Sequence, residues 1–171
     1  MASRTGLLLF HNHVAIEPAL KLFPFGSLPF IRLVRTFRAQ VFQEVATSDS
    51  PGMIYTFLWN LGDVRDKQYI DEVTSLFQSH GADICYVELY SPLQERLRRN
   101  RTEERLREKP SKRDLEASEQ RLLANEVHRL NSDGDFFYPE QHLRIDNIKL
   151  SAREAAEQVI QRFHLETPGT S

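Results

Sequence analysis

Short apolar runs alternate along this chain with longer stretches whose apolar residues recur at helical spacing. The runs at residues 7–10, 53–58 and 84–89 have the length and composition of strands that are buried in a parallel sheet, and residues 143–146 form a shorter candidate strand. Helical patterns cover about 30–45, 66–78, 92–108, 115–130 and 151–163, while residues 14–29 form a loop rich in Pro and Phe. Because parallel strands need crossover helices, the alternation predicts the α/β class, a three-layer parallel sheet with helices on both faces.

The totals fit one domain of ordinary composition. The chain has 171 residues, of which 40% are hydrophobic, and this length allows a substantial core. We expect a single domain over residues 1–166 and a disordered tail over 167–171. The apolar run at residues 7–10 is too short for a signal-peptide core or a membrane span, so we expect a cytoplasmic protein with no membrane partner.

Positive charge is concentrated in the middle of the chain. Residues 95–114 carry nine basic and five acidic side chains, whereas the whole protein has a net charge of −2. Some of this charge fits ordinary helix-surface pairing, as in Glu95 with Arg99. Arg98, Arg101 and Arg105 share a face and have no acidic residue four positions before them, which favours recognition of phosphate. Both interpretations remain open at this point.

Other candidate contacts follow the predicted strands, since parallel sheets gather functional loops at their carboxyl ends. His11, Asn12 and His13 form either a polar substrate contact or a structural loop, and no third ligand has the spacing of a metal site. Arg35 lies with Arg32 and Arg38 on the polar side of the 30–45 helix, as a surface charge or an anion contact. Residues 63–66 begin the next helix as an acidic N-terminal cap, and Arg65 among them is a candidate to face a ligand across the strand ends. A sequence pI near 6.3 without aromatics among the basic residues argues against nucleic acid.

Several motifs occur in an order that resembles a bacterial family of P-loop nucleotide kinases, similar to shikimate, gluconate and adenylate kinases. These motifs are His-Asn-His at 11–13, Trp-Asn-Leu-x-Asp-x-Arg-Asp at 59–66, Asn-Arg-Thr at 100–102, Lys-Pro-Ser-Lys-Arg-Asp at 109–114 and Ile-Asp-Asn at 145–147. The resemblance implies an ATP-dependent phosphotransferase that uses ATP with Mg²⁺ on a small-molecule acceptor. It also implies a P-loop NTPase-like sheet and a helical lid over about 93–130.

The resemblance also implies roles for single residues. Arg101 and Arg105 would be catalytic lid arginines, and with Arg98 they would contact the nucleotide phosphates. Asp146 and Asn147 would lie beside the adenine. The acceptor would be held by His11, Asn12, His13, Arg35 and Arg65, although related kinases often have an aspartate where the histidines stand.

One part of the family pattern is missing from the sequence. The motif G-x-x-x-x-G-K-[ST], whose backbone cradles the phosphates, does not occur. The expected strand order is 2-3-1-4-5, and the first, central strand and its loop have no counterpart here. We therefore expect an N-terminally truncated chain that is inactive alone, or alternatively a non-catalytic binding or regulatory module derived from a P-loop kinase. The oligomeric state is left open.

Overall fold

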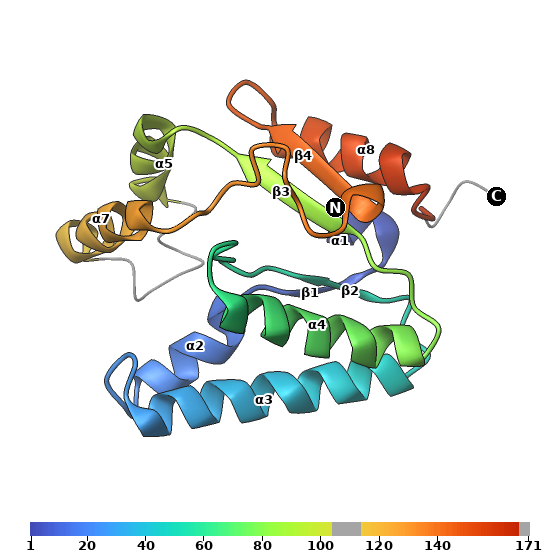
Figure 1. Cartoon of the computed structure of the whole chain (residues 1–171), viewed down its shortest axis with the longest axis horizontal. Helices are drawn as coiled ribbons and strands as arrows, with labels where there is room; N and C mark the ends of the chain where they lie inside the picture. The colour runs from blue at the N-terminus through green and yellow to red at the C-terminus, as the bar shows by residue number, and fades with distance from the viewer. Residues whose placement is uncertain (104–113, 168–171) are drawn as a thin grey trace.

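The computed structural model describes residues 1–103 and 114–167 (Figure 1). Four short strands lie in this part of the chain: β1 (Leu8–Phe10), β2 (Met53–Tyr55), β3 (Tyr86–Tyr90) and β4 (His142–Asp146). The α-helices among the described residues are α1 (Ala2–Thr5), α2 (His13–Leu20), α3 (Leu28–Thr47), α4 (Val64–Ser79), α5 (Leu93–Asn100), α7 (Leu115–Ala124) and α8 (Ala152–Phe163). None of them is both long enough and apolar enough to cross a bilayer.

Local capping explains where the long helices begin. The side chain of Ser27 accepts a hydrogen bond from the backbone N–H of Phe30 at the start of α3, and Asp63 does the same for Arg65 at the start of α4. At the start of α8, Ser151 and Glu154 form a complete capping box. The predicted helices over 30–45, 66–78 and 151–163 are therefore confirmed.

Three helical predictions need correction. Residues 13–20 form α2, where we predicted a loop; Pro18 lies inside this helix, which ends two residues later. The arginine-rich helix ends at Asn100 instead of continuing to about 108, and residues 104–113 lie outside the described part of the chain. After α7 ends at Ala124, a 3₁₀ turn over Asn125–Val127 replaces the predicted continuation to 130.

The strands form two separate parallel pairs, not the single three-layer sheet that we predicted. β1 pairs with β2 in the register Leu8 to Met53, and β3 pairs with β4 in the register Tyr86 to His142. The N–H of Thr56, just after β2, donates to the carbonyl of Phe10 at 3.3 Å. Because every second residue of a strand bonds to the same neighbour, the backbone groups of Ile54 face β1, and those of Met53 and Tyr55 face the opposite edge of β2. No described strand pairs with the edge of β2 that faces away from β1, or with the edge of β3 that faces away from β4. The sheet is therefore interrupted between β2 and β3.

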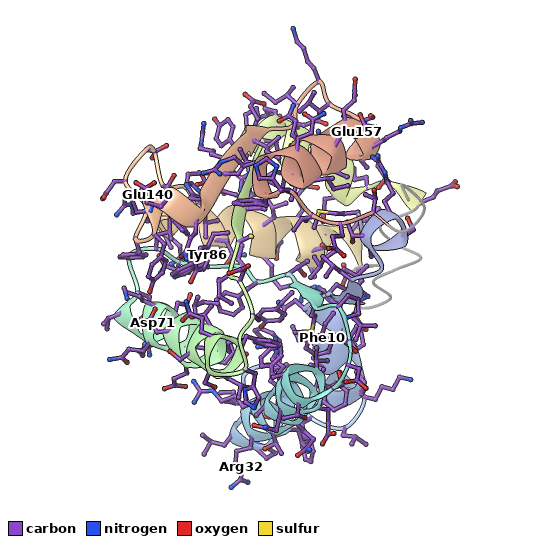
Figure 2. All side chains as sticks on the ribbon, turned by 90° about the vertical axis from the view of Figure 1, so that its right-hand side faces the viewer. Phe10, Arg32, Asp71, Tyr86, Glu140 and Glu157 are labelled. Atoms are coloured by element: carbon purple, nitrogen blue, oxygen red, sulfur yellow. The ribbon has the colours of Figure 1, made fainter. Side chains whose placement is uncertain are left out.

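Helices lie on both sides of the strands. Figure 1 shows α3 and α4 packed along one side of the β1–β2 pair and α8 on the far side of the β3–β4 pair. Figure 2 shows Phe10 among the side chains between the β1–β2 pair and the helices below it. The main core gathers buried apolar residues from β1, α2 and α3, namely Phe10, Ala15, Ala19, Phe30, Val34 and Phe42. The predicted α/β class with parallel strands is thus confirmed.

An aromatic cluster connects the two pairs of strands. Trp59, which follows β2, lies 6.2 Å between ring centroids from Tyr86 at the start of β3 and 5.4 Å from Phe136. Tyr138 stacks on Tyr86 at 4.8 Å, and its hydroxyl hydrogen-bonds to Asp71 of α4. Side-chain packing therefore joins the pairs where backbone pairing does not.

We expect a histidine at the edge of this cluster to make the stability of the protein depend on pH. His142 stacks on Phe136 at 4.0 Å, and its Nε2 lies 3.3 Å from Oε2 of Glu88. Burial lowers the pKa of His142 below its ordinary value of 6.5, although Glu88 acts in the opposite direction. The unfolded chain therefore takes up this proton first as the pH falls.

We expect the free energy of unfolding to decrease as the pH falls below about 6.5, because a group whose folded pKa is lowered binds more protons in the unfolded state. The decrease ends below the folded pKa of His142, where both states are protonated. Urea titrations of the wild type and of His142→Gln between pH 5 and pH 8 measure this effect. The slope should be smaller in His142→Gln and unchanged in His80→Gln, which alters an exposed histidine; equal slopes in all three proteins would contradict the prediction.

Candidate functional site

The carboxyl ends of β1 and β2 hold the predicted substrate residues His11, Asn12 and His13. The backbone N–H of Asn12 donates to Oγ1 of Thr56, just after β2, at 3.0 Å. His13 begins α2, and its Nδ1 lies 2.9 Å from Oε1 of Glu17 one turn later. The parallel pairing therefore brings the two strand ends together, as expected for loops of this class.

A buried arginine lies against this strand end. Arg38 of α3 is 8% exposed, and its Nη2 donates a hydrogen bond to Oδ1 of Asn12. Its Nε and the Nδ1 of His11 are buried and have no hydrogen-bond partner among the residues that the structure describes. No carboxylate pairs with Arg38 in the described part of the chain. A buried guanidinium without an anion is unfavourable, so these donors would gain from contact with an anionic group or with a water molecule.

The nearby tyrosines do not neutralise Arg38. The hydroxyl of Tyr55 lies 3.4 Å from that of Tyr69. Burial, and next the hydrogen bond with Tyr69, raise the pKa of Tyr55 above its ordinary range, although the charge of Arg38 lowers it. The phenol of Tyr55 is therefore neutral at physiological pH and leaves the positive charge of Arg38 uncompensated.

The position of Arg38 corrects its assignment to the polar side of the helix. The buried residues of α3 are Phe30, Val34, Arg38 and Phe42, which are spaced by four. This spacing is visible in the sequence and indicates that Arg38 belongs to the stripe facing the core. Arg35, which we predicted as the anion contact, is exposed and makes no hydrogen bond within the described residues.

A cavity of about 300 Å³ lies beside the end of β2 and the start of α4. Its lining is Leu58, Asn60, Asp63, Arg65, Asp66, Asn125, His128 and Leu130. The predicted contact Arg65 reaches this cavity, but its Nη2 lies 2.7 Å from Oδ2 of Asp63. Hydrogen bonds from the Arg65 side chain and backbone lower the pKa of Asp63 to about 2. Arg65 thus serves as both a cap partner and a wall of the cavity.

Asn60 fixes the opposite wall of the cavity. Its Oδ1 accepts hydrogen bonds from the backbone N–H of Gly62 at 3.1 Å and of Arg129 at 3.2 Å, and its Nδ2 lies 3.3 Å from Nδ1 of His128. The N–H of Leu61 donates to the carbonyl of Arg129 at 2.8 Å. The segment that returns from α7 is therefore attached to the end of β2. The sequence analysis quoted Asn60 within the 59–66 motif without giving it a role and did not consider His128, because the two residues become neighbours only on folding.

The predicted lid arginines are held by carboxylates. Arg98 binds Glu95, three positions before it, through two hydrogen bonds of 2.7 Å, and Arg101 of the α5 end binds Glu119 of α7 at 2.6 Å. The hydrogen bonds from Arg98 and Arg99 lower the pKa of Glu95 to about 2. The sequence analysis looked only for an acidic residue four positions before each arginine. It therefore missed Glu95, which is three positions before Arg98, and Glu119, which lies in another helix. Arg105 lies outside the described residues.

The predicted adenine contacts are joined to α5. Arg99 donates through Nη1 to Oδ1 of Asn147 at 2.9 Å and through Nη2 to its carbonyl at 2.8 Å. Oδ1 of Asp146 accepts from the backbone N–H of Ile148 at 3.1 Å, so this carboxylate closes a turn. The predicted pair of Glu95 with Arg99 is present at 2.6 Å. One end of α5 is thereby attached to the end of β4.

Two of the predicted groups therefore lie at separate strand ends. His11 and Asn12 lie at β1 and β2 with Arg38, whereas Asp146 and Asn147 lie at β4 with Arg99. In the described part of the chain no three His, Cys, Asp or Glu side chains gather as a metal site.

Comparisons of this chain with family models, with curated proteins and with solved structures give no match.

Proposed function

We propose that this chain is a binding module for a small anionic molecule, built on the framework of a P-loop kinase. The observation that carries the proposal is Arg38, a buried cation whose Nε has no partner among the described residues and whose Nη2 is bonded to Asn12, the sequence neighbour of His11. The anion would accept from the free Nε–H and from a ring N–H of His11, and Asn12 would keep the guanidinium in place. A carboxylate or phosphate group suits this set of donors.

The strand pairings support the framework in this proposal. In the order 2-3-1-4-5, the pairs that do not involve the first strand are 2-3 and 4-5. The parallel pairs β1–β2 and β3–β4 correspond to them, and the interruption falls where the first strand would lie. A single P-loop NTPase-like sheet would need a strand that bonds to the free edges of β2 and β3.

A second candidate is the ATP-dependent phosphotransferase, with Mg²⁺, that the resemblance implies. The arginine-rich stretch over residues 95–114 favours it, since clustered guanidinium groups can neutralise a triphosphate. The described residues do not form a triphosphate site by themselves, because Arg98 and Arg101 are bound to Glu95 and Glu119. The sequence also lacks a glycine-rich cradle, so we derive no phosphoryl-transfer step and prefer the binding module.

Ligand titration followed by thermal unfolding tests both candidates. We expect inorganic phosphate, or a small polycarboxylate such as citrate, to raise the Tm. The rise should follow the logarithm of the ligand concentration, because only the folded protein binds the ligand. At about 100 times its Kd, a ligand adds roughly 2.7 kcal/mol to the free energy of unfolding. A rise with ATP and Mg²⁺ but with neither small anion would favour the phosphotransferase. If no anion changes the Tm, the proposed binding function is wrong.

A further inference from the structure

An exposed apolar tip is formed by the turn that connects α2 and α3. The side chains of Leu22, Phe25 and Leu28 are 71%, 71% and 76% exposed, and we call these three residues the apolar tip. Figure 1 shows the α2–α3 connection at one extreme of the molecule, beyond the ends of both helices. Large apolar side chains gathered at a projecting position are typical of an interaction surface.

The turn presents these side chains in a fixed geometry. The N–H of Ser27 donates to the carbonyl of Pro24 at 3.2 Å, and Gly26 has a φ of 78°, as in a type II turn. The Phe25 ring lies 5.1 Å from the buried Phe30 ring between centroids. The backbone of the turn and the Phe25 ring should therefore lose little conformational entropy when the tip meets a partner.

The charged residues of the segment that contains the tip have one sign. Between Glu17 and Glu44 the sequence contains four cationic residues and no acidic residue. Arg38 is buried, whereas Lys21, Arg32 and Arg35 are exposed and pair with no carboxylate in the described part of the chain; we call these three the cationic ring. Figure 2 shows Arg32 extending away from the body of the protein. On α3, Leu28, Arg32 and Arg35 are at spacings that place them on one face.

We propose that the apolar tip and the cationic ring dock this protein on the surface of an anionic lipid bilayer. The tip projects, so it fits a deformable layer better than it fits a flat protein face, and the ring complements anionic headgroups. Leu22, Phe25 and Leu28 would enter the boundary between headgroups and acyl chains while Lys21, Arg32 and Arg35 remain at headgroup level. Such docking needs no membrane-spanning helix. It differs from the sequence expectation of no membrane partner, which rested on the absence of a long apolar run.

Co-sedimentation with vesicles tests the proposal. We expect the wild type to bind vesicles of phosphatidylcholine mixed with phosphatidylserine, to bind pure phosphatidylcholine at least about tenfold more weakly, and to dissociate as salt is added. The double variant Phe25→Ser/Leu28→Ser should bind the mixed vesicles at least about tenfold more weakly because two apolar side chains no longer leave water. Lys21→Glu/Arg32→Glu should abolish the preference for phosphatidylserine.

Matched controls separate docking from unfolding. Val127→Ser removes an apolar side chain that is 83% exposed elsewhere, and Lys149→Glu reverses an exposed charge elsewhere; both should bind mixed vesicles like the wild type. All tip variants should keep the wild-type Tm, since the altered side chains are exposed. In Phe25→Trp, the added indole should be quenched by brominated lipid in mixed vesicles.

Two results would overturn the proposal. One is wild-type protein that stays in the supernatant with phosphatidylserine vesicles at low salt. The other is a mass that increases with protein concentration without lipid and returns to that of a monomer in Phe25→Ser/Leu28→Ser, which would make the tip a contact between copies of this chain.

Discussion

Replacing Arg38 by methionine should make the protein more stable and at the same time remove its response to small anions. Methionine keeps the length and apolar character of the buried stem but removes a guanidinium that pairs with no carboxylate of residues 1–103 and 114–167. We expect the free energy of unfolding to rise by about 1–3 kcal/mol, because the cost of burying an unpaired charge disappears. The Tm rise caused by phosphate or citrate should fall below detection in Arg38→Met.

Arg35→Met is the control for this experiment. Arg35 lies one turn earlier on the same helix and is exposed, so its removal should change the free energy of unfolding by less than about 0.5 kcal/mol and leave the anion response intact. Comparing the two variants also shows which arginine contacts the anion: Arg35, which the sequence indicated, or Arg38, which is buried in the structure. An anion response that survives in Arg38→Met but is lost in Arg35→Met would reverse our assignment.

Phe42→Ala should remove a large part of the free energy of unfolding. Phe42 is 2% exposed, and its ring lies 5.7 Å from Phe10, 5.0 Å from Tyr55 and 6.2 Å from Phe77 between centroids. Removing a buried phenylalanine side chain costs about 3–5 kcal/mol, since apolar area is lost and a cavity remains. Domains are stable by only about 5–15 kcal/mol, so this change removes much of the total.

Urea unfolding followed by circular dichroism measures this loss. Leu33→Ala on the same helix is the matched control, because Leu33 is 44% exposed and should lose less than about 1 kcal/mol. A cost below about 1 kcal/mol for Phe42→Ala would mean that this core is not what holds β1, β2 and α3 together.

The sequence was most informative where a signal is local. The caps of α3, α4 and α8 come from residues within four positions of the helix start, and the apolar spacing along the chain predicted these three helices. The alternation of strands and helices likewise predicted that the strands are parallel. Such patterns could not show whether the strands form one sheet, because that depends on whether a strand bonds to the free edges of β2 and β3.

The site was harder to predict because its contacts are distant in the chain. Asn60 meets Arg129, and Arg101 meets Glu119, only after folding. The exposed position of Arg35 and the buried position of Arg38 differ by one helical turn, and only the spacing with Phe30, Val34 and Phe42 distinguishes them. Charge spacing within one helix therefore shows which arginines are near each other, but not which carboxylates bind them.

The two helices α5 and α7 are joined to each other and to the strand ends at three places. Oγ of Ser118 donates to Oδ1 of the buried Asn100 at 3.0 Å, Arg99 binds Asn147, and Asn60 binds the backbone of Arg129. Displacing α5, or the segment that follows α7, from the strand ends would break these hydrogen bonds. The bond between Ser118 and Asn100 couples the two helices, so we expect them to shift together and only when the contacts at the strand ends open.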